Sequence, residues 1–272
     1  MKFQTRQLSE NFGVEVLDVD LTQTDSVMAE AILSAVQQYA LLLFRRQSLH
    51  DDDLYRLSAA LGPVEEPPAA RDNCSPRFKS VVYLANINSL DGNMIKRNFI
   101  ENTDGAWHSD QAYRQNPATL STLFCVIAPE VGGGTSFSST RMGYESLPTT
   151  LKDRVETMKA RYSPGSSHGV PNIEVSHPAV LANPQSGVKT LYVAPNTRGF
   201  VGLKRSEGEV LKDELLAYQL HPDHIYQHAW RMGDMLIYDN AQLLHKRDAF
   251  EGVRFLKATR LFLSPARFAV PD

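Results

Sequence analysis

The spacing of apolar residues predicts four amphipathic helices in this sequence. In the first, apolar side chains recur every three or four positions after Thr24 and Asp25, two residue types that commonly cap a helix N-terminus. A capping box formed by Ser206 and Glu209 marks the start of the last helix. The predicted helices cover residues 28–39, 51–61, 151–158 and 206–216.

Short apolar runs bounded by Gly, Pro, Asn or Asp predict strands between these helices. The runs are Leu41–Phe44, Ser80–Asn86, Leu120–Ile127, Thr190–Val193, Met235–Tyr238 and Phe255–Leu263. The segment from Arg161 to Pro195 is rich in Ser, Gly, Pro and Asn and is predicted to form long loops, a common place for lids. Strands outnumber helices and do not alternate with them regularly, which argues against Rossmann and TIM-barrel folds. We expect a mainly β fold, a sandwich or open barrel with flanking helices.

The composition is that of a globular protein. The 272 residues are 42% hydrophobic and 22% charged, which excludes a disordered or fibrous chain, and we expect one domain over residues 1–272 with a lid or insert around residues 161–200. No apolar run approaches the roughly 18 residues of a membrane span, and the first residues lack the apolar stretch of a secretory signal. A net charge of −3 without basic clusters gives no reason to expect nucleic acid. Because Cys74 and Cys125 also fit neither a disulfide framework nor a zinc ribbon, we predict a cytoplasmic protein that handles a small molecule.

Two histidines and one aspartate form the main candidate site. Side chains alternate faces in an extended segment, so His108 and Asp110 point the same way. His245 follows an apolar strand and turn, residues 235–240, much later in the chain. Two histidines and a carboxylate on one side of a metal form the facial arrangement of non-haem Fe(II) oxygenases.

Two arginines follow His245 in the chain. Arg254 and Arg260 are six positions apart, so both face the same side of one extended strand, and a buried arginine beside a metal site suits a carboxylate clamp. Each piece alone has an ordinary explanation, because His-x-Asp is common and a strand arginine is usually a rim charge. The Gly132–Thr135 stretch lacks the Gly-Lys-Ser/Thr ending of a P-loop. The joint occurrence of these residues in this order is what favours a metal site.

The sequence resembles the Fe(II)- and 2-oxoglutarate-dependent dioxygenases of the taurine dioxygenase and 2,4-dichlorophenoxyacetate dioxygenase type, the TauD/TfdA family. The resemblance runs from about Gly13 to Pro265 and is densest in two blocks. The first block comprises Trp107–Asp110 and Ala128–Thr135, and the second comprises Tyr226–Asp234, Tyr238–Asn240 and His245. Shorter matching pieces are His177-Pro178, Thr190–Val193 and Gly202-Leu203.

This resemblance implies a double-stranded β-helix, a jelly-roll core with helices packed outside. It also implies that His108, Asp110 and His245 bind Fe(II), that 2-oxoglutarate chelates the metal, and that O2 is the other cosubstrate. The distal carboxylate of 2-oxoglutarate would bind Thr135 and an arginine.

The resemblance identifies the arginine that binds this carboxylate less directly. The position eleven residues after the distal histidine, where taurine-type enzymes carry it, is Leu256 here. The stretch from His245 onward instead looks like that of the butyrobetaine and trimethyllysine hydroxylases, whose clamp arginine begins the strand. We therefore expect Arg254 to bind 2-oxoglutarate and Arg260 to bind substrate or make a secondary contact, with the reverse assignment open.

By the same resemblance the protein is an oxidoreductase that hydroxylates, desaturates or otherwise oxidises an unactivated C–H bond, giving succinate and CO2. The expected substrate is a small polar organic acid or an amino-acid-like molecule. Asp104 stands where the taurine enzymes carry an asparagine, so a sulfonate held in the taurine manner is not expected. Asp104 and Glu101 could contact a substrate ammonium group, or Asp104 could simply cap the turn before Trp107. The substrate-contact candidates are Asp104, Asn86, Tyr113, Arg198, Phe200 and Arg260.

Other functions stay open from the sequence. The chain could be a sensor that binds metal and 2-oxoglutarate without turnover, or an enzyme that cleaves sulfonates or aryloxyalkanoates by hydroxylation. A zinc hydrolase is disfavoured because no glutamate lies beside a histidine in a His-Glu-x-x-His spacing. A homo-oligomer, dimer or tetramer, is compatible with the family resemblance.

Overall fold

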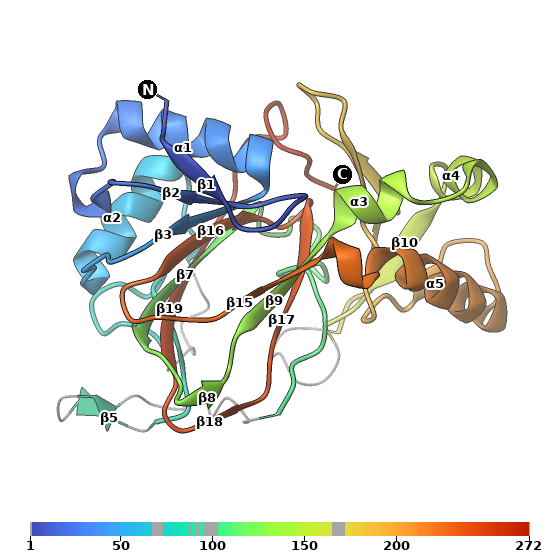
Figure 1. Cartoon of the computed structure of the whole chain (residues 1–272). Coiled ribbons are helices and arrows are strands. Elements are labelled where there is room, and N and C mark those ends of the chain that lie inside the picture. The colour runs from blue at the N-terminus through green and yellow to red at the C-terminus, as the bar shows by residue number, and fades with distance from the viewer. Residues whose placement is uncertain are drawn as a thin grey trace.

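The computed structural model describes residues 2–66, 73–87, 89–90, 93–94, 103–164 and 172–271. Helices lie mainly outside a layered β core (Figure 1). The helices are α1 (Ser26–Tyr39), α2 (Asp51–Leu61), α3 (Thr140–Glu145), α4 (Thr149–Val155) and α5 (Arg205–Gln219), with 3-10 turns at Leu21–Gln23 and Pro222–His224.

The larger sheet has seven strands in the order β1-β2-β3-β16-β7-β19-β4. Its strands pair antiparallel except β2 with β3, which are parallel. The strands are β1 (Thr5–Gln7), β2 (Val14–Val16), β3 (Leu41–Phe44), β4 (Val82–Ala85), β7 (Leu120–Ile127), β16 (Met235–Asp239) and β19 (Phe255–Leu261). We call it the major sheet.

A smaller sheet of three strands, the minor sheet, has the order β15-β9-β17. Its strands are β15 (Ile225–His228), β9 (Thr135–Ser139) and β17 (Leu243–Arg247), and β8 (Val131–Gly132) pairs with β18 (Phe250–Glu251) near one end. The Phe137 ring of β9 meets the Tyr238 ring of β16 edge-on, with 5.1 Å between centroids, so the two sheets pack face to face. This is the jelly-roll core that the sequence predicts, and Figure 1 shows both layers.

The continuous apolar runs of the major sheet arise because both of its faces are covered. In β3, Leu42 and Phe44 pack toward the helices, whereas Leu41 and Leu43 pack toward the minor sheet. The helix-side core includes Ile32, Val36, Leu54, Leu57, Leu61, Leu120, Phe124, Met235, Ile237 and Leu261. The inter-sheet core includes Leu41, Leu43, Leu123, Cys125, Phe137, Trp230, Leu236, Tyr238, Leu243, Leu256 and Ala258.

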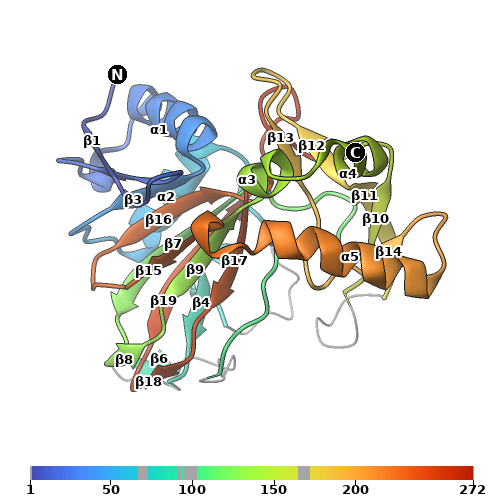
Figure 2. The ribbon, with the colours of Figure 1, turned by 45° about the vertical axis from the view of Figure 1, so that its right-hand side comes forward.

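A third cluster of apolar residues, the lateral core, lies among α3, α4, α5 and the nearby short strands, beside the two sheets in Figure 2. These strands are β10 (Lys159–Tyr162), β11 (Val175–Pro178), β12 (Val180–Ala182), β13 (Lys189–Leu191) and β14 (Gly199–Phe200). The remaining pair, β5 (Ser89–Leu90) and β6 (Asn93–Met94), forms a separate two-stranded hairpin.

The prediction of long loops from Arg161 to Pro195 is wrong for much of its described part, because the end of β10 and all of β11 and β12 fall in this segment. β13 overlaps the strand that was predicted over Thr190–Val193. These strands have only three or four residues each, so turn residues dominate the composition. β10 pairs with β11 and β14, which lie farther along the chain, whereas β12 and β13 pair with each other. Residues 165–171 lie outside the described residues, and closure of the 161–200 region over the site stays a prediction.

Helix starts follow the polar residues at their N-termini. The Asp25 carboxylate accepts a hydrogen bond from the Met28 amide at 2.8 Å, which confirms the predicted cap of α1. The predicted start of α2 at Asp51 and its end before Gly62 are also confirmed. α4 begins at Thr149 and ends at Val155, which shifts the helix predicted over 151–158 toward Pro148.

The N-cap of α5 lies two residues earlier than predicted. Lys204 is the N-cap, and its backbone N–H donates to the Glu207 carboxylate at 3.0 Å. The assignment to Ser206 and Glu209 is therefore wrong, since both residues lie inside the helix. Ser206 and Glu209 have the residue types of a capping box, whereas the lysine at the observed N-cap is not a capping residue type, so only the backbone geometry reveals it.

Among the described residues no helix is long and apolar enough to cross a membrane.

Candidate active site

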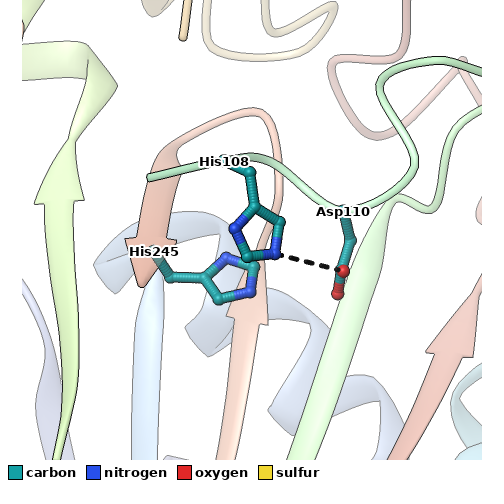
Figure 3. A group of neighbouring side chains, drawn as sticks. All are labelled: His108, Asp110 and His245. Atoms are coloured by element: carbon teal, nitrogen blue, oxygen red, sulfur yellow. Dashed lines mark ion pairs between the residues drawn. The ribbon is translucent and has the colours of Figure 1, made fainter. Parts of the chain in front are cut away.

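His108 and His245 are neighbours across two paired backbone segments. The His108 N–H donates to the His245 carbonyl at 3.0 Å, and the His245 N–H donates back at 2.9 Å. This antiparallel bridge brings the two rings to 4.2 Å between centroids. Figure 3 shows both imidazoles on the same side of the bridge.

Asp110 completes the group two residues after His108. The His108 Nε2 atom lies 3.9 Å from Asp110 Oδ1 (Figure 3). One ligand atom from each of His108, Asp110 and His245 lies within 4.8 Å of the others. The sequence prediction that His108 and Asp110 share a face and meet His245 is confirmed in geometry.

Each histidine has a ring nitrogen available to bind a metal ion. The Nδ1 atom of His108 lies 2.8 Å from the Ala106 carbonyl. Because a carbonyl only accepts, Nδ1 carries a proton, and Nε2, toward Asp110, is the ring nitrogen left to bind a metal ion. Burial, followed by the nearby His108, lowers the pKa of His245 to about 3, so that ring is neutral at physiological pH.

Asp110 is held as a carboxylate. Burial favours its neutral acid, but the charge of Arg260, together with a hydrogen bond from Ser121, brings the Asp110 pKa well below its usual range. The Ser121 hydroxyl donates to Oδ2 at 2.6 Å, and Arg260 approaches Oδ1 at 3.2 Å. The Asn240 side chain donates to Ser121 Oγ at 2.9 Å and so fixes the hydroxyl that binds Asp110.

These residues fit a divalent metal ion. Two imidazoles and one ionised carboxylate converge from one side, and the Nδ1 atom of His245 is buried without a hydrogen-bond partner in the described part of the chain. Such a donor set binds Fe(II) in facial-triad sites and leaves further coordination positions for other ligands.

A second polar group lies farther along the same sheets. Thr135 of β9 is almost fully buried and shares a strand face with Phe137, whose ring stacks 6.1 Å from His245. The Thr135 hydroxyl accepts a hydrogen bond from the Trp230 indole N–H at 3.1 Å. Its own hydrogen remains able to donate to a bound acceptor.

Arg254 lies next to this region, immediately before β19. Its Nε donates to the Gly133 carbonyl at 3.0 Å, and its guanidinium lies 5.9 Å from the centre of the Phe250 ring. Gly133 has a φ of +65°, and a Cβ atom there would lie 2.4 Å from Pro129 Cγ. Only glycine therefore fits at the position whose carbonyl binds Arg254.

The two candidate arginines share one strand face, as predicted. Leu256 and Ala258, which lie between them on that face, pack in the inter-sheet core. Arg260 has two carboxylate partners, Asp110 at 3.2 Å and Glu65 at 3.7 Å. For Arg254, no carboxylate of the described residues lies within ion-pair distance.

The other substrate candidates either make hydrogen bonds to the backbone of this chain or lie in the lateral core or on the surface. Asn86 accepts from the Arg254 amide and donates to the Gly252 carbonyl, and Asp104 accepts from the Ala249 amide. Phe200 is buried in the lateral core, Tyr113 packs against it half-buried, and Arg198 is exposed. Glu101 lies outside the described residues.

Several residues around Asp110 were given no role in the site by the sequence analysis. They are Ser121, Tyr238, Asn240, Gln111 and Glu65. Ser121 had a detectable signal, since it is a polar residue inside a long apolar run. Glu65 had none, because Glu66 beside it looks equivalent in sequence but is exposed.

Comparisons with known proteins agree with this geometry. A family model described as "Taurine catabolism dioxygenase TauD, TfdA family" matches residues 4–260. The chain is 30% identical to the alpha-ketoglutarate-dependent 2,4-dichlorophenoxyacetate dioxygenase of Cupriavidus pinatubonensis, covering 86% of this chain and 88% of that protein. It is also 30% identical to the (S)-phenoxypropionate/alpha-ketoglutarate-dioxygenase of Sphingobium herbicidovorans, covering 90% and 88%.

A solved structure has the same fold. AAD-2, crystallised in complex with Mn(II) and N-oxalylglycine, superposes with a TM-score of 0.82 at 23% identity, covering 97% of this chain and 99% of that one. At this identity the likeness establishes the fold, and the family model together with the two 30%-identical relatives establishes the family. The chain belongs to the TauD, TfdA family and is a dioxygenase that depends on 2-oxoglutarate.

Proposed function

We propose that this dioxygenase oxidises a C–H bond of a small organic acid at an Fe(II) ion held by His108, Asp110 and His245. The convergence of these three side chains within 4.8 Å of one another is the observation that carries the proposal. Together with 2-oxoglutarate and O2, the metal supplies the oxidising chemistry, and 2-oxoglutarate leaves as succinate and CO2.

The protein's own contribution is to orient the ligands. His108 is fixed by the Ala106 carbonyl, and Asp110 is fixed by Ser121 and Arg260. Groups bound to a ligand in this way set its orientation and basicity, and their loss typically costs about 10- to 100-fold in metal affinity or activity.

We propose Arg254 as the residue that binds the distal carboxylate of 2-oxoglutarate. Its guanidinium is buried, and the only hydrogen bond that it makes to the described residues goes through Nε to a neutral carbonyl. A buried cation without a counterion is costly, so a ligand carboxylate at this place would offset that cost. Thr135 is the expected hydroxyl donor to the same carboxylate.

We propose a different role for Arg260. Its charge is already compensated by Asp110 and Glu65, so a ligand carboxylate gains less there than at Arg254. Its Nε is buried and has no hydrogen-bond partner in the described ranges, which leaves one donor for a substrate or for the metal-proximal end of 2-oxoglutarate.

The substrate class we propose is a small carboxylic acid. The two 30%-identical relatives are named for 2,4-dichlorophenoxyacetate and (S)-phenoxypropionate, which favours oxidation of an aryloxyalkanoate as a second, narrower candidate. An amino-acid substrate has less support, because the Asp104 carboxylate already accepts the Ala249 amide hydrogen at 2.8 Å.

Succinate formation tests the proposal. Purified protein is supplied with Fe(II), 2-oxoglutarate, O2 and a panel of aryloxyalkanoic, aliphatic carboxylic, amino and sulfonic acids. We expect coupled succinate release with members of the carboxylic acid group. Asp110→Ala should reduce this turnover more than 100-fold, whereas Asp213→Ala, at an exposed acid of α5, should leave it unchanged. Normal turnover by Asp110→Ala would contradict the metal assignment.

A further inference from the structure

Glu65 is a buried acid fixed beside the metal-ligand group by its own backbone. The segment that leaves α2 runs antiparallel to the end of β19, with a bridge between Val64 and Leu261. The Glu65 N–H donates to the Arg260 carbonyl at 2.8 Å. Only 3% of Glu65 is exposed, so the position of its carboxylate is set by the fold.

The Glu65 carboxylate is surrounded by donors. Gln111 Nε2 donates to Oε1 at 2.7 Å, and Arg114 lies 3.1 Å from the same oxygen. Arg260 lies 3.7 Å from Oε2. A buried carboxylate is tolerated only when it is paired in this way.

Two of these partners lead directly to Asp110. The Arg260 guanidinium lies between Glu65 Oε2 and Asp110 Oδ1, and Oδ1 is the oxygen that faces His108 Nε2. Gln111 is the residue after Asp110 and has a φ of +59°, a left-handed conformation that is unfavourable for glutamine. The hydrogen bond from Gln111 to Glu65 therefore stabilises this strained backbone conformation, which sets the orientation of the preceding residue, Asp110.

We infer that Glu65 is a positioning residue for the metal ligand Asp110, acting through Arg260 and Gln111. The inference rests on the proposed metal site. Glu65 and Asp110 both compensate the positive charge of Arg260. Burial opposes that charge, but the two carboxylates together raise the Arg260 pKa above its usual value. Without the Glu65 charge, Arg260 has Asp110 as its sole carboxylate partner in the described structure and competes with a metal ion for Oδ1.

Metal binding by the apoprotein tests this role without turnover. Co(II) is titrated into the metal-free protein and followed by its visible absorption. Glu65→Gln keeps an oxygen that can accept from Gln111 but removes the charge, and we expect about tenfold weaker Co(II) binding. Glu66→Gln removes the same charge at the exposed neighbouring position and should change the affinity less than twofold.

The same titration separates a positioning role from a simple charge effect. In an Arg260→Gln background, Glu65→Gln should weaken Co(II) binding less than threefold further, because the residue through which it acts is absent. A full tenfold loss in that background would overturn the inference. If Glu65→Gln does not fold, Glu65→Asp, which keeps the charge but is one methylene shorter, should still bind several-fold more weakly than wild type.

Failure of the inference and failure of the proposed function give different results. If wild type binds Co(II) and Asp110→Ala does not, the metal site stands, and unchanged binding by Glu65→Gln or Glu65→Asp would refute only the role of Glu65. If wild type does not bind Co(II), both the proposed metal site and the role of Glu65 are wrong.

Discussion

Arg254, which is buried just before β19, and Arg260, which is half-buried within β19, have opposite electrostatic surroundings. Arg260 lies between two carboxylates, Asp110 and Glu65, which raise its pKa in spite of burial. At Arg254, burial and then the nearby Arg247 lower the pKa to about 10. The charge of Arg260 is thus compensated by carboxylates, whereas the charge of Arg254, at the other end of the same strand face, is not.

This difference supports the roles proposed for the two arginines. A cation that already has carboxylate partners serves the protein's own structure, whereas a cation with a neutral partner has binding energy left for an anion. Excess charge at Arg254 therefore suits the distal carboxylate of 2-oxoglutarate, and compensated charge at Arg260 suits the orientation of a metal ligand. Strand position alone does not distinguish these roles, since both side chains point to the same face.

The largest effect that tests this comparison is expected at Arg254. Arg254→Gln should raise the KM for 2-oxoglutarate about 10- to 100-fold, because a hydrogen bond to a charged group contributes roughly 1.5–3 kcal/mol. Arg260→Gln should change this KM less than fivefold and act mainly on kcat and on metal affinity. Steady-state kinetics at saturating substrate and Fe(II) measures both.

Arg205→Gln serves as the control for loss of a surface arginine, because Arg205 is exposed at the start of α5. Its kinetics should match wild type. A larger rise in KM for Arg260→Gln than for Arg254→Gln would exchange the two assignments.

The buried histidine of the proposed metal site should also affect the stability of the apoprotein at acid pH. An ordinary histidine titrates near pH 6.5, whereas burial and His108 bring the pKa of His245 to about 3. Between these values the unfolded chain binds a proton that folded His245 does not. The free energy of unfolding should therefore fall as pH is lowered, by about 1.4 kcal/mol per pH unit from this residue. The depressed pKa of Asp110 adds to the loss only below its unfolded value, near pH 3.8.

Denaturant unfolding of the apoprotein between pH 6 and pH 4.5 measures this slope. His245→Gln should reduce the slope by the equivalent of one proton relative to wild type. His221→Gln, at a histidine whose side chain is 54% exposed, should leave it unchanged. Equal slopes for all three proteins would mean that His245 is not held neutral.

The two ends of the site were predictable from the sequence to different degrees. Alternation of side chains placed His108 with Asp110, and Arg254 with Arg260, because each pair lies within one extended segment. His245 was singled out because it follows an apolar strand and turn, and the family resemblance then implied that it shares a metal with His108. Its backbone bridge to His108 joins distant segments and has no local signal. Glu65 was missed for the same reason, since only its pairing with the end of β19 distinguishes it from Glu66.

The fold shows the same division. Long apolar runs such as β7 and β16 were predicted nearly to the residue, because both of their faces are buried and the run is continuous. The short strands β10, β11 and β12 were not, because three or four residues in a polar segment carry little pattern. β10 and β11 pair across longer stretches of chain, and all three strands contribute to the lateral core, which cannot be read from local sequence.

The smallest effect is expected at Thr135, at the 2-oxoglutarate end. Thr135→Val removes the proposed hydroxyl donor, and the KM for 2-oxoglutarate should rise about two- to tenfold, the value of a neutral hydrogen bond. The same change leaves the buried Trp230 indole N–H without its acceptor, so the free energy of unfolding should fall by about 1–3 kcal/mol. Thr135→Ser keeps the hydroxyl and should retain the wild-type KM. If Thr135→Val lost stability while its KM stayed at the wild-type value, Thr135 would only support Trp230, and Arg254 alone would bind the carboxylate.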